Sequence, residues 1–268
     1  MDRRKFLKHG ALGAVAVTAG TTVKAKTTEI DMSEAAKVGF NHIPSPESTT
    51  IKTKTMKAVI HKAASRGHAN HGWLDSHHTF SFASYYNPER MHFGVLRVLN
   101  DDMVVGGMGF GKHPHDNMEI ISIPLEGDLE HKDSMGNTFT IKKNDVQVMS
   151  AGTGIFHSEK NKHKDQAVKF LQIWVFPNKK NVTPRYDQVT FNPEDRINKL
   201  QQVLSPSKDD EGVWIHQDAW FYMSDLKAGK TVNHKINKLG NGLYLFVLEG
   251  EAKVGEYTIG KRDGMGIT

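Results

Sequence analysis

The chain has 268 residues, of which 38% are hydrophobic, so it can bury the core of one large domain or of two smaller ones. It contains no cysteine, which excludes disulfides, thiolate zinc sites and a cysteine nucleophile, so that any metal must be held by His and carboxylate. The formal net charge of +5 comes from 35 Lys and Arg against 30 Asp and Glu.

Residues 1–25 have the three-part pattern of an export signal. A charged start is followed by a Gly- and Ala-rich stretch that is too short to span a bilayer, and Val23-Lys24-Ala25 fits a small-residue cleavage site. The run RRKFLK, which begins with Arg3-Arg4, resembles the twin-arginine export motif. We therefore expect a periplasmic protein. Without these residues 30 basic and 29 acidic residues remain, a net charge of +1, so we expect no nucleic-acid partner and no membrane span in the mature chain.

Residues 26–55 are polar, contain Pro-Ser-Pro and predict a linker. From Met56 onward the chain consists of short apolar runs separated by Gly, Asn and Asp, a pattern typical of an all-β sandwich or barrel. The exception is PEDRINKLQQVLS (193–205). Pro193 at its start and apolar residues spaced by three and four predict a short helix that connects two halves.

Two parts of the chain repeat one pattern. Residues 123–152 (IPLEGDLEHKDSMGNTFTIKKNDVQVMSAG) and 246–267 (FVLEGEAKVGEYTIGKRDGMGI) each contain Leu-Glu-Gly, a polar hairpin, Thr-Ile and then a basic residue two positions before Asp. The second copy has the shorter hairpin. A duplicated β-unit explains both.

The most informative residues are two pairs with a spacing of two. His113 and His115 flank Pro114, and His157 and Glu159 follow a glycine-containing turn. On a strand, residues two apart face the same side, so two short segments would each present two ligand-type side chains. Three imidazoles and one carboxylate suit Fe(II), Ni, Mn, Cu or Zn and leave positions open for a substrate. In the second repeat only His234 stands at a comparable place, so we expect one half alone to bind metal.

Three segments resemble the metal-binding half of the pirin family: GFGKHPHDNMEII, LEGDLEHKDSMGN and DVQVMSAGTGIFHSE. Residues 71–102 resemble the family's N-terminal signature; they read HGWLDSHHTFSFASYYNPERMHFGVLRVLNDD. A further family segment resembles FLQIWVFP. The resemblance covers Met56 to the C-terminus and implies a bicupin: a metal-binding cupin at 56–185 and a second cupin at 186–268. Since the family usually continues beyond GKRDGMGIT, we expect the second cupin to be shortened or to close differently.

The same resemblance implies the metal ligands His113, His115, His157 and Glu159. It implies one divalent transition metal, which we expect to be Fe(II), with Ni, Mn, Co, Cu or Zn as alternatives. The implied activity is that of a quercetin 2,3-dioxygenase, which opens a flavonol with O₂, and Glu159 would then be the base for the flavonol hydroxyl. The alternative is a non-catalytic metal-binding bicupin that acts as a sensor or binding module. We expect a monomer.

Other polar residues have more than one reading. Glu119 stands where other cupins have a carboxylate ligand, and we expect it beside the ligands rather than among them. The pair His77-His78 precedes an aromatic run and predicts either core packing or a wall of the substrate mouth. We expect His131, in a charged hairpin, to be solvated. Ser158 would face away from His157 on a strand and is not a candidate nucleophile.

Overall fold

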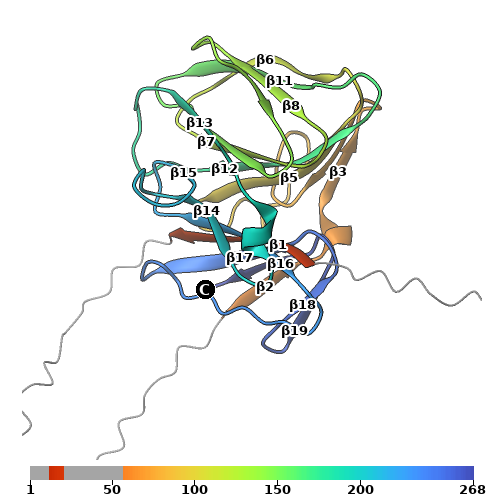
Figure 1. Ribbon diagram of the computed structural model, residues 1–268, viewed down its shortest axis with the longest axis vertical. Helices are drawn as coiled ribbons and strands as arrows, with labels where there is room; N and C mark the ends of the chain where they lie inside the picture. The colour runs from red at the N-terminus through yellow and green to blue at the C-terminus, as the bar shows by residue number, and fades with distance from the viewer. Residues whose placement is uncertain (1–11, 21–56) are drawn as a thin grey trace, which may run out of the picture.

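The computed structural model describes residues 57–268 and the backbone of residues 12–20, and in these residues the chain is almost entirely β-structure. Two barrels are stacked along the long axis, with β5, β6, β8 and β11 in the upper one and β16 to β19 in the lower one (Figure 1). The all-β bicupin predicted from the sequence is confirmed. The arginine pair and residues 26–55 lie outside the described residues, so the predicted signal motif and linker stay predictions.

The first barrel is a seven-stranded sheet facing a four-stranded sheet. The larger sheet has the order β13-β10-β7-β12-β5-β4-β3 and the smaller one has the order β6-β11-β8-β9. The strands are β3 (Gly67–Asn70), β4 (Leu74–His78), β5 (Leu96–Val104), β6 (Gly109–His115), β7 (Glu119–Glu126), β8 (Leu129–Asp133), β9 (Thr138–Ile141), β10 (Asp145–Ser150), β11 (Ile155–Asn161), β12 (Val168–Val175) and β13 (Arg185–Thr190).

The second barrel contains a seven-stranded sheet of order β15-β14-β16-β1-β17-β20-β2 and the ribbon β18-β19. Its strands are β1 (Leu12–Gly20), β2 (Ala58–His61), β14 (Gln201–Ser205), β15 (Val213–Trp214), β16 (Trp220–Leu226), β17 (Asn241–Val247), β18 (Glu251–Val254), β19 (Tyr257–Gly260) and β20 (Gly264–Ile267). A short turn, η1 (Ala63–Ser65), connects β2 to β3. Strand β2 belongs to the range predicted for the first cupin, yet it pairs with β20 and covers that strand's free side.

Strand β1 comes from the stretch that the sequence analysis assigned to an export signal. Its backbone is paired antiparallel to β16 from Leu12↔Leu226 to Thr18↔Trp220, and to β17 from Ala14↔Val247 to Gly20↔Asn241. It is therefore an internal strand of the sheet, with a hydrogen-bonded neighbour on each side.

The two barrels share one apolar core. Strands β5, β7, β10 and β12 are buried on both faces: one face looks into the first barrel and the other packs against the second barrel. Each fully buried aliphatic or aromatic side chain stabilises the fold by about 1.5–3 kcal/mol relative to exposure. The largest cluster joins residues of the first barrel (Leu96, Leu99, Ile121, Ile123, Val146, Val148, Leu171, Ile173, Val175) to residues of the second (Val203, Leu204, Val213, Phe221, Tyr244, Phe246).

The internal repeat is visible in the fold, since β7–β10 and β17–β20 have the same order of strands and turns. Gly127 and Gly250 both adopt positive φ, 74° and 78°, at the first turn of their copy. Asp145 accepts a hydrogen bond from the backbone N–H of Lys142, and Asp263 accepts one from that of Gly260. Equivalent turns with equivalent Asp contacts support the duplication.

The predicted helix at 193–205 is wrong beyond its first turn. Only η2 (Pro193–Arg196), a single 3₁₀ turn, is helical, and Asn192 caps it by accepting a hydrogen bond from the backbone N–H of Glu194. Asn198 then takes a positive φ of 56°, and β14 follows. Burial of Val203 and Leu204 in the core between the barrels outweighs the helical spacing of the apolar residues.

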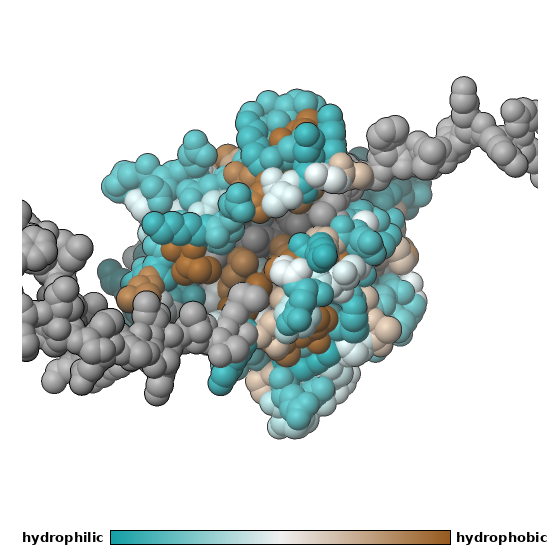
Figure 2. All heavy atoms as spheres, turned by 90° about the horizontal axis from the view of Figure 1, so that it is seen from below, coloured by the Kyte–Doolittle hydropathy of each residue, from teal (hydrophilic) through white to brown (hydrophobic). Residues whose placement is uncertain are grey.

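Seen from below, the molecule shows hydrophobic side chains in a hollow between hydrophilic rims (Figure 2). An open pocket of about 900 Å³ in the second barrel is lined by apolar residues that include Leu200, Leu226, Leu243 and Leu245. Among the described residues, none of the helical turns is long and apolar enough to cross a membrane.

Candidate metal centre

Strands β6 and β11 bring the two predicted pairs together. They run antiparallel, with His157 directly opposite His113 and Phe156 opposite Pro114. Along β11 the side chains alternate between the barrel interior and the outside, and His157 and Glu159 are both buried while Phe156 is exposed. The period of two that the sequence predicted is confirmed for this strand.

The three imidazoles of His113, His115 and His157 form one cluster. Their ring centroids lie 4.4–4.9 Å apart, and one ring nitrogen from each lies within 4.8 Å of the others. His113 Nδ1–H donates to the Gly111 carbonyl at 2.7 Å, which leaves its Nε2 lone pair free for a ligand. Both ring nitrogens of the buried His157 lack a hydrogen-bond partner within the described residues. An orphaned buried imidazole next to two others fits a divalent transition metal.

The electrostatics keep His115 and His157 neutral, which is the form that binds a metal. Burial, together with the neighbouring His113, lowers the pKa of His115 to about 4. Burial also moves the pKa of His157 far below its usual range, and His113, His115 and His131 push it in the same direction. A divalent cation at this place would accept the lone pairs of three ring nitrogens.

Glu159 is fully enclosed in the barrel, and its carboxylate oxygen Oε1 accepts a hydrogen bond from Ser122 at 3.1 Å. It lies on the same face of β11 as His157 but is not among the donors within 4.8 Å of one another. Burial raises the pKa of Glu159 to about 7, opposed by the Ser122 hydrogen bond and assisted by the charge of Asp102. Its role as a fourth ligand stays a prediction, whereas its protonation near neutral pH follows from its surroundings.

A cavity of about 220 Å³ opens beside these residues. Its wall carries the rings of Phe82, Phe110 and Trp174, and the Trp174 ring lies 5.0 Å from that of His115. Three residues of the wall have a buried polar atom with no hydrogen-bond partner among the described residues: His78 Nδ1, Asn100 Oδ1 and Trp174 Nε1. Unpaired polar atoms around a partly apolar cavity indicate a ligand with both aromatic and polar groups.

The expectation that His131 is solvated is wrong. Its side chain is completely buried on β8, its Nε2 lies 3.0 Å from Asp133 Oδ2, and its ring lies 5.4 Å from that of His157. The strand alternation turns His131 inward beside Glu159, together with Asp133, whose side chain is also completely buried, while Lys132 between them faces outward.

The remaining candidates are separated by strand alternation. Glu119 is buried at the start of β7, accepts a hydrogen bond from Ser150 at 2.7 Å and stands outside the histidine cluster. Burial raises its pKa to about 7. His78 is buried in the cavity wall, while His77 is half-buried and faces the other side of the sheet. In the second barrel, among the described residues, His234 belongs to no group of three possible ligands.

Several residues of the site were not found from the sequence: Ser122, Gln172, Trp174 and Asp102. Ser122, Gln172 and Trp174 stand within the apolar runs of β7 and β12, and Asp102 ends the polar stretch of residues 100–102 in β5. Asp102, Gln172 and Trp174 line the cavity, and Ser122 contacts Glu159. A polar residue that interrupts an apolar strand is the signal that would have indicated Ser122 and Gln172.

Comparisons with known proteins give a consistent result. A family model described as Pirin matches residues 59–175, and one described as Quercetinase C-terminal cupin domain matches residues 202–268. Quercetin 2,3-dioxygenase of Escherichia coli strain K12 is 44% identical over 208 residues, 78% of this chain and 88% of that protein. A pirin-like protein of Caulobacter vibrioides is 40% identical over 202 residues, 75% of this chain and 86% of that protein. The crystal structure of bacterial pirin YhhW from Escherichia coli in complex with nickel(II) gives a TM-score of 0.74 at 42% identity, covering 78% of this chain and 89% of that one.

Proposed function

This chain belongs to the pirin family, and from that premise we propose that it is a metal-dependent dioxygenase that opens a flavonol such as quercetin with O₂. The observation that carries the proposal is a buried carboxylate beside three convergent imidazoles, at a cavity with aromatic walls and unpaired polar atoms. The name of the Escherichia coli relative supports the same activity.

We propose that His113, His115 and His157, with Glu159 as the fourth ligand, hold one divalent transition metal, Fe(II) by the sequence expectation. The Escherichia coli pirin structure contains nickel(II), and nitrogen-rich donor sets accept either ion. When bound, the metal supplies Lewis-acid stabilisation of negative charge on a substrate oxygen and holds the two reactants next to each other.

The protein's own contribution begins with Glu159. Its carboxylate lines the cavity beside the imidazoles, where it can accept the flavonol 3-hydroxyl proton, and burial, which raises its pKa in the metal-free chain, favours the protonated form. Ser122 Oγ lies 3.1 Å from both Glu159 Oε1 and Gln172 Oε1, and its single proton can serve one of them at a time. When Glu159 takes up the substrate proton, the Ser122 hydroxyl can turn to Gln172, so that no buried acceptor is left without a donor.

The cavity walls position the substrate. The rings of Phe82, Phe110 and Trp174 offer faces and edges to an aromatic ring, and Trp174 Nε1–H offers a donor to a hydroxyl or carbonyl oxygen. The volume of about 220 Å³ is below the range of about 300–1,000 Å³ that encloses a drug-sized ligand. A flavonol would therefore enter with its hydroxyl-carbonyl end and leave its outer ring at the mouth.

The experiment is oxygen uptake by metal-reconstituted protein with quercetin, measured together with release of carbon monoxide, which should equal the oxygen consumed. Glu159→Gln should lose the activity, and Glu126→Gln, an exposed carboxylate on the same barrel, should keep it. The small cavity favours a second candidate, a metal-binding module without turnover. Absence of uptake with Fe, Ni, Mn, Co and Cu, while the metal stays bound, would support that candidate and end the first.

We also propose export by the twin-arginine route to the periplasm. The support is the sequence RRKFLK with the apolar segment and small residues that follow it. That route accepts folded domains, so the first barrel could take up its metal before the chain meets the copper and zinc that outcompete iron at most nitrogen and oxygen sites.

A further inference from the structure

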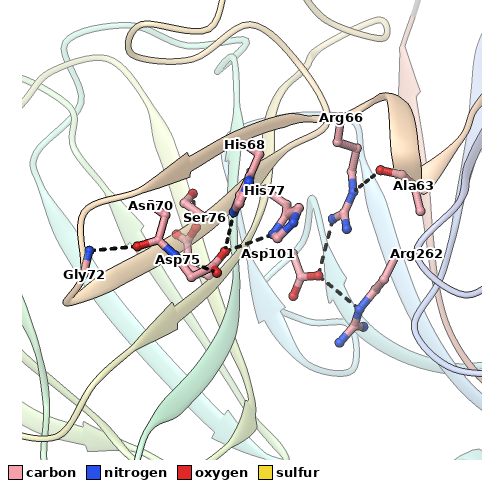
Figure 3. Close-up of polar contacts among 11 residues, drawn as sticks. Ala63, Arg66, His68, Asn70, Gly72, Asp75, Ser76, His77, Asp101 and Arg262 are labelled. Atoms are coloured by element: carbon pink, nitrogen blue, oxygen red, sulfur yellow. Dashed lines mark hydrogen bonds and ion pairs between the residues drawn. The ribbon is translucent and has the colours of Figure 1, made fainter.

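A second group of ligand-type side chains lies on the outer face of the first barrel. His68 is on the edge strand β3, and Asp75 and His77 are on β4. In the register of these strands His68 is directly opposite His77, and Asn70 is directly opposite Asp75. Residues opposite each other or two apart share a face, so all four side chains point the same way (Figure 3).

The two imidazoles converge on one carboxylate oxygen. His68 Nε2 lies 2.9 Å from Asp75 Oδ1, and His77 Nδ1 lies 3.4 Å from the same atom. The rings are stacked with centroids 4.4 Å apart and an angle of 18°, and the three donor atoms lie within 4.8 Å of one another. Ligands on a tetrahedral ion with bonds of about 2.1 Å are about 3.4 Å apart, which is close to the two nitrogen–carboxylate distances. Because the two rings are nearly parallel, one imidazole has to rotate about its side-chain torsions before both lone pairs can meet at one ion.

We propose that His68, Asp75 and His77 form a second site for a divalent transition metal, separate from the histidine cluster inside the barrel. Two nitrogens and one oxygen select ions such as Zn²⁺, Ni²⁺ or Cu²⁺ over Mg²⁺ and Ca²⁺, which prefer all-oxygen sites. The side chains are 50%, 28% and 37% exposed, so the ion reaches the site directly and water completes its coordination.

The surroundings prepare the site. Asn70 Nδ2 donates to Asp75 Oδ2 at 3.2 Å, and its own oxygen accepts from the Gly72 N–H, so the carboxylate is held with Oδ1 toward the imidazoles. Outer contacts of this kind orient ligands in metal sites. Arg66 and Arg262 are both bound to Asp101, at 3.3 and 3.0 Å, which keeps the guanidinium groups away from Asp75 (Figure 3). Burial and the charge of Arg66 lower the pKa of His77, which favours the neutral, ligating imidazole.

A simple ion pair does not account for the arrangement, since it needs only one imidazole. The same barrel contains such a pair, His163 with Asp128, at the same distance of 2.9 Å and with similar exposure, and within the described part of the chain no second imidazole joins it. The pair provides a matched control.

An ion at this second site would stabilise the pairing of β3 with β4. Asp75 and His77 border an open groove of about 580 Å³ that also includes Lys261 and Arg262 of the second barrel. A bound ion would link the edge strand β3 to β4 through their ligand side chains. Ala69 of β3 lies in the wall of the inner cavity. Binding on the outer face would therefore stabilise a strand that forms part of the wall of the inner cavity.

The experiment counts metal ions in the full chain by equilibrium dialysis against micromolar Zn²⁺ or Ni²⁺ followed by elemental analysis. We expect two ions for the unaltered chain and one for the double variant His113→Ala/His157→Ala. Adding His68→Gln and His77→Gln should remove the remaining ion, whereas adding His163→Gln should not. Circular dichroism of each variant checks the fold, and Cu²⁺ electron paramagnetic resonance should show two nitrogen-coordinated species in the unaltered chain and one in each single-site variant.

Two results would overturn the proposal. The first is that the inner-site double variant, folded as judged by circular dichroism, binds no ion. The second is that His68→Gln/His77→Gln alone still binds two. Because the count does not depend on turnover, failure of the dioxygenase activity would leave this result unchanged.

Discussion

Asp102 is a buried carboxylic acid that forms no ion pair with the other described residues. It lies on β5 with 4% exposure, and its hydrogen-bond partner is the Ser76 hydroxyl rather than a cation. Burial raises its pKa to about 7, the Ser76 hydrogen bond opposes the rise and Asp101 adds to it. The folded chain therefore keeps Asp102 protonated at a pH where the unfolded chain has already ionised it.

This difference makes stability depend on pH. Between the ordinary pKa of 3.8 and about 7, the folded state holds one proton more than the unfolded state. Its free energy of unfolding then falls by about 1.4 kcal/mol for each pH unit, or about 4 kcal/mol over the whole interval. The stabilising contribution is complete below the lower pKa and is lost as the pH rises through the upper one.

Asp102→Asn removes the titrating group and keeps an acceptor for Ser76. Its buried amide adds a cost that does not vary with pH, so the informative quantity is how the difference in unfolding free energy between variant and unaltered chain changes with pH. We expect the variant to gain about 4 kcal/mol relative to the unaltered chain between about pH 4 and pH 8. Urea unfolding of metal-free protein in the presence of a chelator measures it.

Asp209→Asn, at an exposed position, controls for the loss of one negative charge. A difference between the Asp102→Asn and unaltered chains that stays constant over this pH range would refute the reasoning, because it would mean that Asp102 ionises alike in the folded and unfolded chains.

Three further predictions concern the inner site and export. His157→Ala should lower the bound metal at the inner site to background without unfolding the chain, since its ring nitrogens have no other partner among the residues that the structure describes; elemental analysis and circular dichroism check this, and retained metal would show that the ligands are misassigned. Glu159→Gln should retain part of the metal and lose quercetin turnover, and an unchanged rate of oxygen uptake would remove Glu159 as the base. A reporter fused to residues 1–25 should stay in the cytoplasm when Arg3 and Arg4 become Lys, and export of that variant would contradict the twin-arginine assignment.

The sequence predicts the histidine cluster because the relevant spacing is short and local. His113 and His115 flank one residue, His157 and Glu159 flank another, and a strand puts such pairs on one face whatever the rest of the fold does. The internal repeat is equally local, and it correctly predicted two related β-units. Strand alternation predicted that each pair shares a face, the shared sequence pattern predicted the repeat, and the resemblance to the pirin family joined the two pairs into one ligand set.

What the sequence did not predict depends on distant partners. The apolar spacing in residues 193–205 fits a helix, but Val203 and Leu204 find their partners in the core between the barrels. His131 stands in a charged segment, and only the pairing of β8 with β11 shows that it faces the buried Glu159. Asp102 and Gln172 acquire a role only when the barrel closes around them. Long-range packing overrode local propensity in each case.

Under the export proposed above, the nine residues of strand β1 would have two roles. Between β16 and β17 their backbone is engaged on both sides, whereas a translocation receptor has to find the same stretch free. An export signal in this stretch would become inaccessible to the receptor as soon as the second barrel folds. Export would then compete with folding of the second barrel, and the relative rates of the two processes would set the exported fraction. A substitution that slows folding of that barrel should therefore increase the fraction of molecules that is exported.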